Sequence, residues 1–234
     1  MIAAMPVLPL SLPLLAAATV TSGALAILSA PWALGQPWMN WLFKPLTTLL
    51  VIASAWPRGA ERPLARRWVR LGLLLSLCGD VALMWPERGF LPGLVSFLLA
   101  HLAYLRAFTR DGVHLAARPL PFMLYGGLAA FILWQLWPGV PPGLRLPVLA
   151  YVVCLASMAA QAAVVALKSR GTPSQRNGVW LAVGGALFLC SDALLATNRF
   201  AAPLPVSSLW ILLSYWLAQW CIASWLPAPR EASA

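Results

Sequence analysis

The chain alternates between long hydrophobic runs and short clusters of proline, glycine and charged residues. The hydrophobic runs do not alternate with a period of two, so they predict helices rather than strands. Their length of roughly 20 residues is the length a helix needs to cross the ~30 Å hydrocarbon core of a bilayer. The pattern predicts eight spans, with bounds good to a few residues: 10–29, 38–56, 68–85, 90–109, 119–137, 146–167, 177–197 and 204–226.

The composition explains why the pattern points to a membrane rather than to a soluble core. The chain is 61% hydrophobic and 9% charged, and its mean hydropathy is +0.80. A soluble domain of this length cannot bury so much apolar surface, and lipid cannot hydrogen-bond to exposed backbone groups. We therefore expect an all-α, polytopic bundle of about eight transmembrane helices that forms a single integral membrane domain over residues 1–234.

The formal net charge of +10 suggests a nucleic-acid partner at first sight, but the basic residues are scattered over short loops. Lys and Arg accumulate on cytoplasmic loops of membrane proteins, which is the simpler interpretation here. Only Arg88, Arg145 and Arg199 flank the other side, and Lys44 lies within a span. Twelve basic residues share the cytoplasmic side: Arg58, Arg62, Arg66, Arg67, Arg70, Arg106, Arg110, Arg118, Lys168, Arg170, Arg176 and Arg230. This distribution predicts that both termini lie in the cytoplasm and argues against a nucleic-acid partner. We expect the membrane to be a bacterial inner membrane.

Tryptophan residues support the same orientation. Indole rings favour the membrane–water interface, and six fall where the opposite interface is expected: Trp32, Trp38, Trp41, Trp85, Trp137 and Trp210. The N-terminus lacks a positively charged stretch, so we expect its first apolar run to be a retained helix rather than a signal peptide. The four cysteines all lie inside spans without metal-ligand spacing, and we expect them to be small apolar packing residues without disulfides.

Two short stretches are nearly the same, and each places an aspartate inside a hydrophobic span. Residues 77–83 read LCGDVAL and residues 189–195 read LCSDALL, so Asp80 and Asp192 correspond. The next spans also match, with SFLLAH at 96–101 against SYWLAQ at 214–219. The matching spans run in the same direction, which suggests two four-helix repeats, about 10–110 and 119–226, related by a pseudo-two-fold axis along the membrane normal.

Asp80 and Asp192 are the strongest functional candidates, because the chain holds only six acidic residues and a carboxylate within a bilayer is costly unless it is paired, hydrated or protonated. Each lies about five residues from the outer end of its predicted span, which is ~7–8 Å at 1.5 Å per residue. The repeat would set them face to face. Lys44 reaches a similar depth from the same side.

Other polar residues share helix faces with these groups or with one another. Because polar faces in a membrane bundle point inward, we expect them to converge on one cavity. The sets are Asn40, Lys44, Thr47 and Thr48; His101 and Tyr104; and Tyr215 and Gln219, with Asn198 and Arg199 at the outer mouth.

A structural interpretation competes with the functional one at each position. The aspartates could pair with Lys44 or with serine hydroxyls to lock helices together, and Lys44 could instead extend to the interface. His101, Tyr104, Tyr215 and Gln219 could be interhelical hydrogen-bonding or packing residues, and Asn198 with Arg199 could cap a helix. Glycines at 72, 126, 127, 184 and 185 permit close helix contacts within one chain or between chains, which leaves the oligomeric state open.

Taken in order, these motifs resemble the YhhN-type membrane family, which includes the lysoplasmalogenases. The resemblance covers about residues 40–220 and leaves out the first helix. Its motifs are Lys44-Pro45-Leu46-Thr47, Gly79-Asp80, residues 96–101 with Tyr104, Phe188-x-x-Ser191-Asp192 with Asn198-Arg199-Phe200, and Tyr215 with Gln219.

The resemblance implies an eight-helix hydrolase that cleaves the vinyl ether bond of a lysoplasmalogen, a single-chain phospholipid, to a fatty aldehyde and a glycerophospho-base. Asp80 and Asp192 match the two aspartates of the family, and Lys44, His101, Tyr104 and Gln219 match its other polar positions. Two carboxyls suit the chemistry, one neutral as proton donor and one ionised, as in glycoside hydrolysis. We expect no metal and no cofactor.

Two other classes fit the same pattern. Eight helices with a parallel repeat and ionisable residues at membrane depth also describe a small-solute or proton-coupled transporter. A structural or accessory membrane protein would tolerate replacement of both aspartates. Release of aldehyde from lysoplasmalogen by purified protein separates the enzyme from both.

Overall fold

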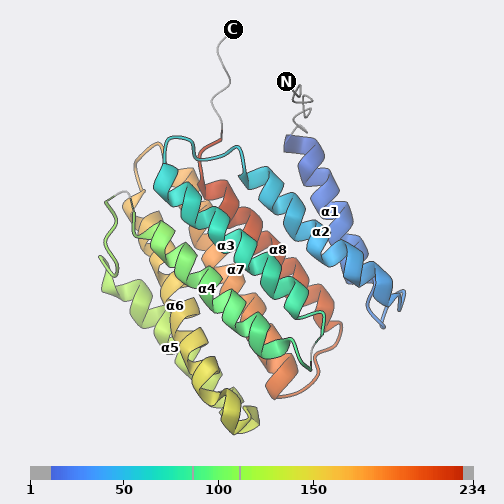
Figure 1. Cartoon of the computed structure of the whole chain (residues 1–234). Helices are drawn as coiled ribbons and strands as arrows, with labels where there is room; N and C mark the ends of the chain where they lie inside the picture. The colour runs from blue at the N-terminus through green and yellow to red at the C-terminus, as the bar shows by residue number, and fades with distance from the viewer. Residues whose placement is uncertain (1–11, 86, 111, 229–234) are drawn as a thin grey trace, which may run out of the picture.

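The computed structural model describes residues 12–85, 87–110 and 112–228, and within them it contains eight α-helices and two short 3₁₀ turns (Figure 1). The helices are α1 (Leu12–Leu28), α2 (Pro37–Ala55), α3 (Pro63–Ala82), α4 (Phe90–Phe108), α5 (Pro119–Leu136), α6 (Arg145–Lys168), α7 (Gln175–Phe200) and α8 (Ser207–Trp225). The turns, Trp137–Gly139 and Pro142–Leu144, connect α5 to α6. The all-helical fold expected from the sequence is confirmed.

Proline and charged residues account for where the helices begin. Pro37, Pro63 and Pro119 are the first residues of α2, α3 and α5, a position where the missing N–H costs nothing. α3 begins five residues before its predicted bound of 68 because it includes a basic first segment that a purely hydrophobic span leaves out. Arg230 and the first residues of the predicted 10–29 span lie outside the described residues.

The helices pack as four antiparallel neighbouring pairs around a shared centre. α7 lies against α8 and α3 against α4 in the two most extensive contacts, while α1 pairs with α2 and α5 with α6. α2 also contacts α3 and α8, and α6 also contacts α4 and α7. α1 and α5 therefore lie at opposite edges of the bundle (Figure 1).

Small residues set the closest helix contacts near the candidate site. A Cβ atom built on Gly79 would lie 2.5 Å from the ring of Phe97, so α3 can approach α4 this closely only with glycine here. Gly184 and Gly185 allow α7 the same approach to α8 and α6. Gly72 likewise lies against the ring of Tyr104 on α4, whereas Gly126 and Gly127 on α5, also expected at contacts, face open space.

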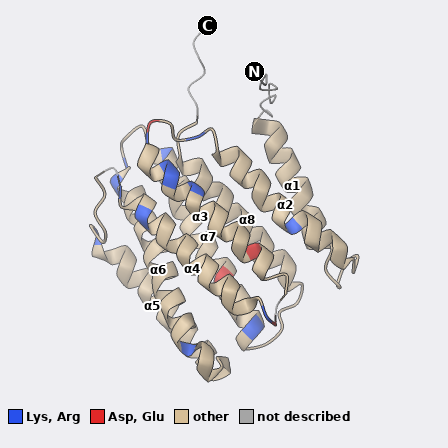
Figure 2. Ribbon diagram, in the orientation of Figure 1, with Lys and Arg blue, Asp and Glu red and all other residues tan. Residues whose placement is uncertain are grey.

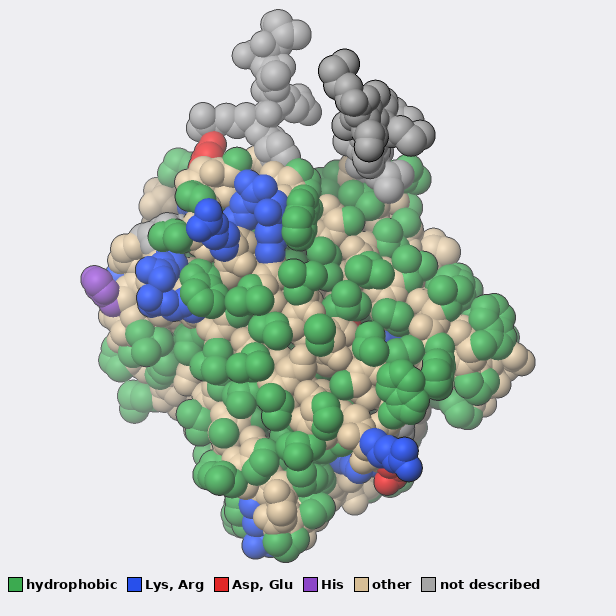
Figure 3. Space-filling view, viewed as in Figure 1, with side chains coloured by type: hydrophobic (Ala, Val, Ile, Leu, Met, Phe, Trp, Pro, Cys, Tyr) green, Lys and Arg blue, Asp and Glu red, His purple; other side chains and the backbone are tan. Residues whose placement is uncertain are grey.

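The surface of the bundle is that of a protein surrounded by lipid. Leucine, valine and tryptophan side chains are exposed on every helix, and the face shown in Figure 3 is hydrophobic between two ends that carry charge. Four helical segments are long and apolar enough to cross a membrane: Phe90–Phe108, Pro119–Gly139, Pro142–Lys168 and Gln175–Phe200. Lys and Arg gather mainly at the end where α2, α4 and α6 finish (Figure 2).

The tryptophans and cysteines refine the picture from the sequence. Trp32, Trp38, Trp41, Trp85 and Trp210 are exposed, as residues of an interface should be. All four cysteines are free, and Cys154 and Cys221 are buried as expected of packing residues. Cys78 and Cys190 are instead exposed on the outside of the bundle, because their helix faces turn away from its centre.

Candidate active site

Asp80 lies in the last turn of α3, and its side chain is held by two neighbouring helices. Thr48 on α2 and Tyr215 on α8 both donate hydrogen bonds to Asp80 Oδ2, at 2.6 and 2.7 Å. The indole N–H of Trp216 in turn donates to the Thr48 hydroxyl at 3.1 Å. Asp80 is only 2% exposed, so these donors replace water around a buried carboxylate.

Lys44 provides the opposite charge for Asp80. Its Nζ lies 3.9 Å from Asp80 Oδ1 and donates to the backbone carbonyl of Asp80 at 3.2 Å. Lys44 is itself 9% exposed, so it does not extend outward to the interface, as one of the sequence interpretations allowed. A buried pair of this kind retains both charges only where each is compensated.

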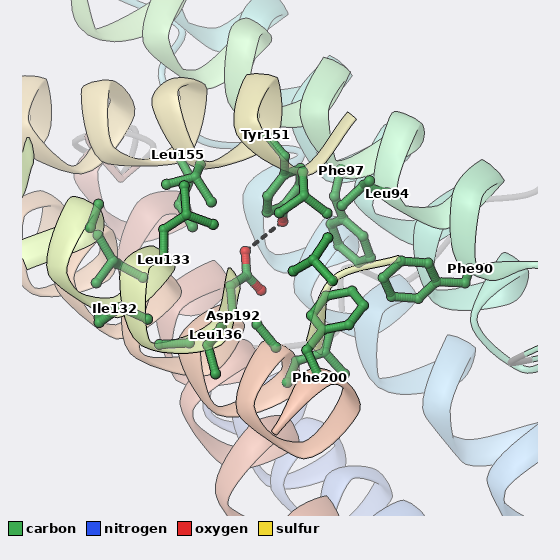
Figure 4. A pocket seen from close by; sticks show the side chains of 18 of the residues that line it. Phe90, Leu94, Phe97, Ile132, Leu133, Leu136, Tyr151, Leu155, Asp192 and Phe200 are labelled. Carbon is green, nitrogen blue, oxygen red and sulfur yellow. Dashed lines mark hydrogen bonds between the residues drawn. The ribbon is translucent and has the colours of Figure 1, made fainter. Parts of the chain in front are cut away.

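Asp192 lies on α7 in a different environment. The Tyr151 hydroxyl on α6 donates to Asp192 Oδ2 at 2.5 Å, and the two side chains point toward each other in Figure 4. Asp192 as a residue is half-buried. Apart from Tyr151, the side chains labelled around it in Figure 4 are leucine, isoleucine and phenylalanine, so Asp192 has one hydroxyl donor in apolar surroundings.

The two aspartates line one cavity of about 280 Å³. Its other walls include Lys44 and Tyr215, which also contact Asp80, and Phe97, which separates the deeper core from the cavity. Further polar residues line it toward the end where α7 finishes: Asn40, Ser191, Asn198, Arg199, Ser207 and Ser208. The cavity is wide enough for several waters or for a polar headgroup.

A second, smaller cavity of about 90 Å³, which Figure 4 shows, also has Asp192 in its wall. The two share Leu83, Phe90, Phe97, Asp192 and Leu195 as wall residues. Tyr151 and Asp192 are the residues of its wall that carry polar side chains; the others are aliphatic or phenylalanine. Asp192 therefore lies at a boundary between a polar and an apolar space.

Six of the nine site residues expected from the sequence thus reach the polar cavity: Asp80, Asp192, Lys44, Asn40, Asn198 and Tyr215. Asn198 Oδ1 also accepts a hydrogen bond from the backbone N–H of Leu204, at 2.9 Å, and so orders the connection between α7 and α8. Thr47, expected on the same face as Lys44, instead hydrogen-bonds Ser22 on α1 at 2.9 Å.

The remaining three, His101, Tyr104 and Gln219, do not line the cavity. They lie deeper in the bundle, where the Tyr104 hydroxyl donates to Gln219 Oε1 at 2.6 Å. Neither ring nitrogen of the buried His101 has a hydrogen-bond partner among the described residues. Its ring packs edge-on against Phe188 and against Tyr151, the partner of Asp192. Their supporting role stays a prediction.

The depth of the two aspartates differs from the simple expectation of equal distance from the helix ends. Asp80 lies two residues before the end of α3, while Asp192 lies eight residues before the end of α7. α7 extends past its predicted bound of 197 to Phe200, and its last residues help to form the mouth of the cavity. The two carboxyls reach the same cavity despite these unequal positions.

Sequence reasoning missed Tyr151. It is a polar group near the start of the apolar α6, 8% exposed, and the rule that singled out the aspartates would have found it as well. It was overlooked because no second polar residue marks its helix face. The arrangement as a whole offers a paired carboxylate, a carboxyl in apolar surroundings and space for water, which are the groups that acid–base hydrolysis needs.

The described residues contain no group of three or more His, Cys, Asp and Glu side chains that could hold a metal ion.

Comparison with known proteins gives a consistent result. The model of the YhhN family matches residues 39–226. Lysoplasmalogenase TMEM86B of Sus scrofa is 36% identical over 79% of this chain and 74% of its own length. Lysoplasmalogenase TMEM86B of Homo sapiens is 31% identical over 78% and 73% of the two chains. Lysoplasmalogenase of Mycobacterium bovis is 31% identical over 71% and 62%.

No solved structure matches this chain significantly. The matched region begins in the first turn of α2 and ends after α8, so it contains both aspartates and their partners and leaves out α1.

Proposed function

We propose that this chain, which belongs to the YhhN family, is a membrane-embedded lysoplasmalogenase that hydrolyses the vinyl ether bond of a single-chain ether phospholipid. Its relatives in animals and mycobacteria carry the name lysoplasmalogenase. The products would be a fatty aldehyde and a glycerophospho-base.

One observation supports the proposal most strongly: two carboxyl side chains from different helices line the same cavity, and their surroundings differ. Asp80 has a lysine and two hydroxyl donors, which favour its ionised form. Asp192 has one hydroxyl donor and an apolar cavity beside it, which favours its neutral form. Unlike surroundings of this kind separate an acid from a base in carboxyl-dependent hydrolases.

The proposed roles follow from these environments. Asp192, as a neutral acid, would donate a proton to the β-carbon of the vinyl ether, which is the vinyl carbon that is not bonded to oxygen. The carbon bonded to oxygen then becomes part of an oxocarbenium ion, which the Asp80 carboxylate stabilises electrostatically. A water molecule from the polar cavity adds to this carbon and gives up a proton to the Asp192 carboxylate, so a hemiacetal forms and the acid is regenerated.

The hemiacetal then collapses. The carbon–oxygen bond to the glycerol breaks as Asp192 gives a proton to the glycerol oxygen. The hydroxyl formed from water becomes the carbonyl of the aldehyde, and its proton returns to Asp192. One water is consumed, and the acid that was spent in the first step is regenerated. Lys44 would act by holding Asp80 ionised, since its ammonium group is already engaged with that residue.

We further propose that all eight helices span the membrane, with both termini in the cytoplasm of a bacterial cell. The remaining helices, α1, α2, α3 and α8, have 17, 19, 20 and 19 residues, which lies within the range of lengths that can cross a bilayer. The twelve basic residues expected at the cytoplasmic face include eleven among the described residues, and Figure 2 shows Lys and Arg concentrated at one end.

The two-repeat architecture also remains our proposal, with support from the packing. α2 contacts α3 and α8, and the equivalent α6 contacts α7 and α4. Each aspartate also receives a hydroxyl hydrogen bond from the helix before its own in sequence. Thr48 on α2 donates to Asp80 on α3, and Tyr151 on α6 donates to Asp192 on α7.

The direct test is to replace each carboxyl by an amide. Asp80→Asn and Asp192→Asn should each abolish release of aldehyde from lysoplasmalogen while the protein remains folded after extraction from membranes. The matched control is Glu87→Gln, since Glu87 is an exposed acid in the α3–α4 connection that does not line the cavity. It should retain full activity.

Full activity in either aspartate variant would remove that residue from the mechanism. If the wild-type protein releases no aldehyde but supports flux of a solute into vesicles, the protein is a transporter and the proposed function fails.

A further inference from the structure

Three hollows connect the candidate site to the outside of the bundle. The polar cavity shares Asp192 with the apolar cavity of about 90 Å³. That cavity in turn shares Ile132, Leu189 and Ala193 with a groove of about 510 Å³ between α5 and α7. Neighbouring hollows that share wall residues therefore follow one another from the polar cavity, past Asp192, to the side of the protein.

The groove is apolar and faces outward. Its α5 wall includes Leu124 and Leu128, which are 63% and 47% exposed. Its α7 wall includes Leu194 and Thr197, and the Thr197 hydroxyl is already bonded to the backbone carbonyl of Ala193 at 2.7 Å. The groove thus offers its occupant hydrocarbon contacts and little hydrogen bonding.

The gap exists because α5 leans on α6 and barely touches α7. Only Pro121, Ala129 and Leu136 of α5 are buried. An unfilled apolar gap loses dispersion contacts on both of its walls, and in a bilayer a hydrocarbon chain is the ready material to fill it.

The sizes of the hollows suggest how such a chain would lie. An engineered apolar cavity of about 150 Å³ in another protein holds one benzene, so the 90 Å³ cavity holds only a few carbons of a chain. The wider groove has room for the rest.

We propose that the α5/α7 groove and the apolar cavity form a lateral channel that binds the single hydrocarbon chain of the substrate and delivers its ether end to Asp192. The inference rests on the proposed function and deepens it, because the channel would make the site selective for phospholipids with one hydrocarbon chain over those with two. A lipid with one chain can enter the channel from the bilayer with its headgroup in the polar cavity. A second acyl chain would be excluded, because the apolar cavity has room for only a few carbons of one chain.

The first experiment measures binding without hydrolysis and uses a native residue. Cys190 lies in the wall of the groove and is exposed, while Cys78 is exposed on α3 away from it. In lipid nanodiscs, a single-chain phospholipid with a saturated ether, which cannot be hydrolysed by vinyl ether protonation, should slow maleimide labelling of Cys190 about tenfold. Labelling of Cys78 should not change.

Equal rates at Cys190 with and without the ether lipid, or equal slowing at both cysteines, would overturn the channel. This result does not depend on catalysis. If the wild-type protein releases no aldehyde yet Cys190 is selectively protected, the proposed function fails while the channel remains as a lipid-chain site.

The second experiment narrows the channel and reads out chain length. Ala129 lines the apolar cavity and is 7% exposed, whereas its neighbour Ala130 is exposed. Ala129→Phe should lower kcat/KM about tenfold for long-chain lysoplasmalogens and much less for short-chain ones, since hydrophobic pockets discriminate by fit. Ala130→Phe adds the same ring on the neighbouring, exposed position and should leave the chain-length profile unchanged.

An equal loss for all chain lengths in folded Ala129→Phe, or the same profile for both variants, would contradict the channel. If Ala129→Phe does not fold, the Cys190 measurement on the wild-type protein decides the question alone.

Discussion

At the residue scale, the two carboxyl groups are tolerated in the bundle for different reasons. Asp80 is fully engaged: Thr48, Tyr215 and Lys44 all point donors at its side chain or backbone. Asp192 relies on Tyr151 alone. A carboxyl with so few partners is easier to keep protonated, and its reactivity should be correspondingly sensitive to the one donor that it has.

The Tyr151 hydroxyl can therefore be tested alone. Tyr151→Phe should lower kcat about 10- to 100-fold, because a hydrogen bond to a carboxyl that changes charge contributes roughly 1.5–3 kcal/mol. Aldehyde release under saturating substrate measures the effect. Ser157→Ala on the same helix is the control, because the Ser157 hydroxyl donates to the backbone carbonyl of Val153; this variant should have wild-type kcat. An unchanged kcat in Tyr151→Phe would exclude a role for the hydrogen bond between Tyr151 and Asp192.

The Lys44–Asp80 pair makes a prediction about stability as well as activity. Lys44→Met should lower the free energy of unfolding by about 3 kcal/mol, since it leaves a buried carboxylate without its counter-charge. The double variant Lys44→Met with Asp80→Asn should regain most of that stability but no activity.

Thermal unfolding and aldehyde release of the two variants provide the measurement. If the double variant is no more stable than Lys44→Met, the two residues are not coupled as the 3.9 Å separation of their charged atoms implies.

The sequence revealed the charged residues of the site more readily than its uncharged ones. Asp80, Asp192 and Lys44 stand out because each is costly in lipid. Helix periodicity grouped His101 with Tyr104 on one face of α4, and Tyr215 with Gln219 on one face of α8. Periodicity predicts which face of a helix a residue occupies, but not how far the residue lies from the polar cavity along the helix axis. Only Tyr215 of these four reaches the polar cavity.

At the element scale, the close pairing of α3 with α4 positions Asp80. Gly79 permits the Phe97 ring to lie against the α3 backbone, and Phe97 in turn packs edge-on against Tyr215, with 5.8 Å between ring centroids. Tyr215 is one of the donors to Asp80. The spacing of two helices is thereby linked to the geometry of a carboxylate.

A single methyl group at this contact tests the link. Gly79→Ala should destabilise the protein by about 1–3 kcal/mol, because a ring in a packed core cannot move away freely, and should lower activity through displacement of Asp80. Gly126→Ala on α5 meets no atom within 4 Å and should be neutral or slightly stabilising, since alanine is the better helix former by ~1 kcal/mol.

Thermal unfolding of both variants in the same detergent makes the comparison. Equal stability of the two variants would mean that the Phe97 ring can move away from an added methyl group on α3 without lowering the free energy of unfolding.

Helix positions could be predicted from the sequence, while their ends and partners could not. Hydrophobic runs locate all eight helices, but α3 and α7 continue beyond the hydrophobic stretch because a helix can extend into water once it has begun. Which helices lie beside α6 depends on side-chain packing between segments far apart in the chain. The hydrogen bond between Tyr151 and Asp192 could therefore not be predicted from the sequence.

At the scale of the whole molecule, charge and hydrophobicity divide the bundle into two ends and a middle (Figures 2 and 3). The polar cavity lies toward the end where α7 finishes, opposite the end that is richest in basic residues. With that basic end in the cytoplasm, the cavity would face the other side of the membrane.

Reporter fusions test this orientation. A reporter that is active only outside the cytoplasm should be inactive when inserted after Glu61 in the α2–α3 connection and active when inserted after Ala202 in the α7–α8 connection. A fusion after Arg230 should again be inactive. The reverse pattern would invert the orientation, and the same activity at the first two sites would contradict the eight-span arrangement.

The ion pair of Lys44 has a chemical consequence for an enzyme that would produce aldehydes. A neutral lysine amine beside an aldehyde condenses with it to an imine, the reaction by which lysines form Schiff bases. Lys44 is the one lysine on the wall of the polar cavity, and an ammonium group paired with Asp80, as proposed, would have no free electron pair to attack a carbonyl. The carboxylate that stabilises the cation would thereby also protect the enzyme from covalent capture by its own product.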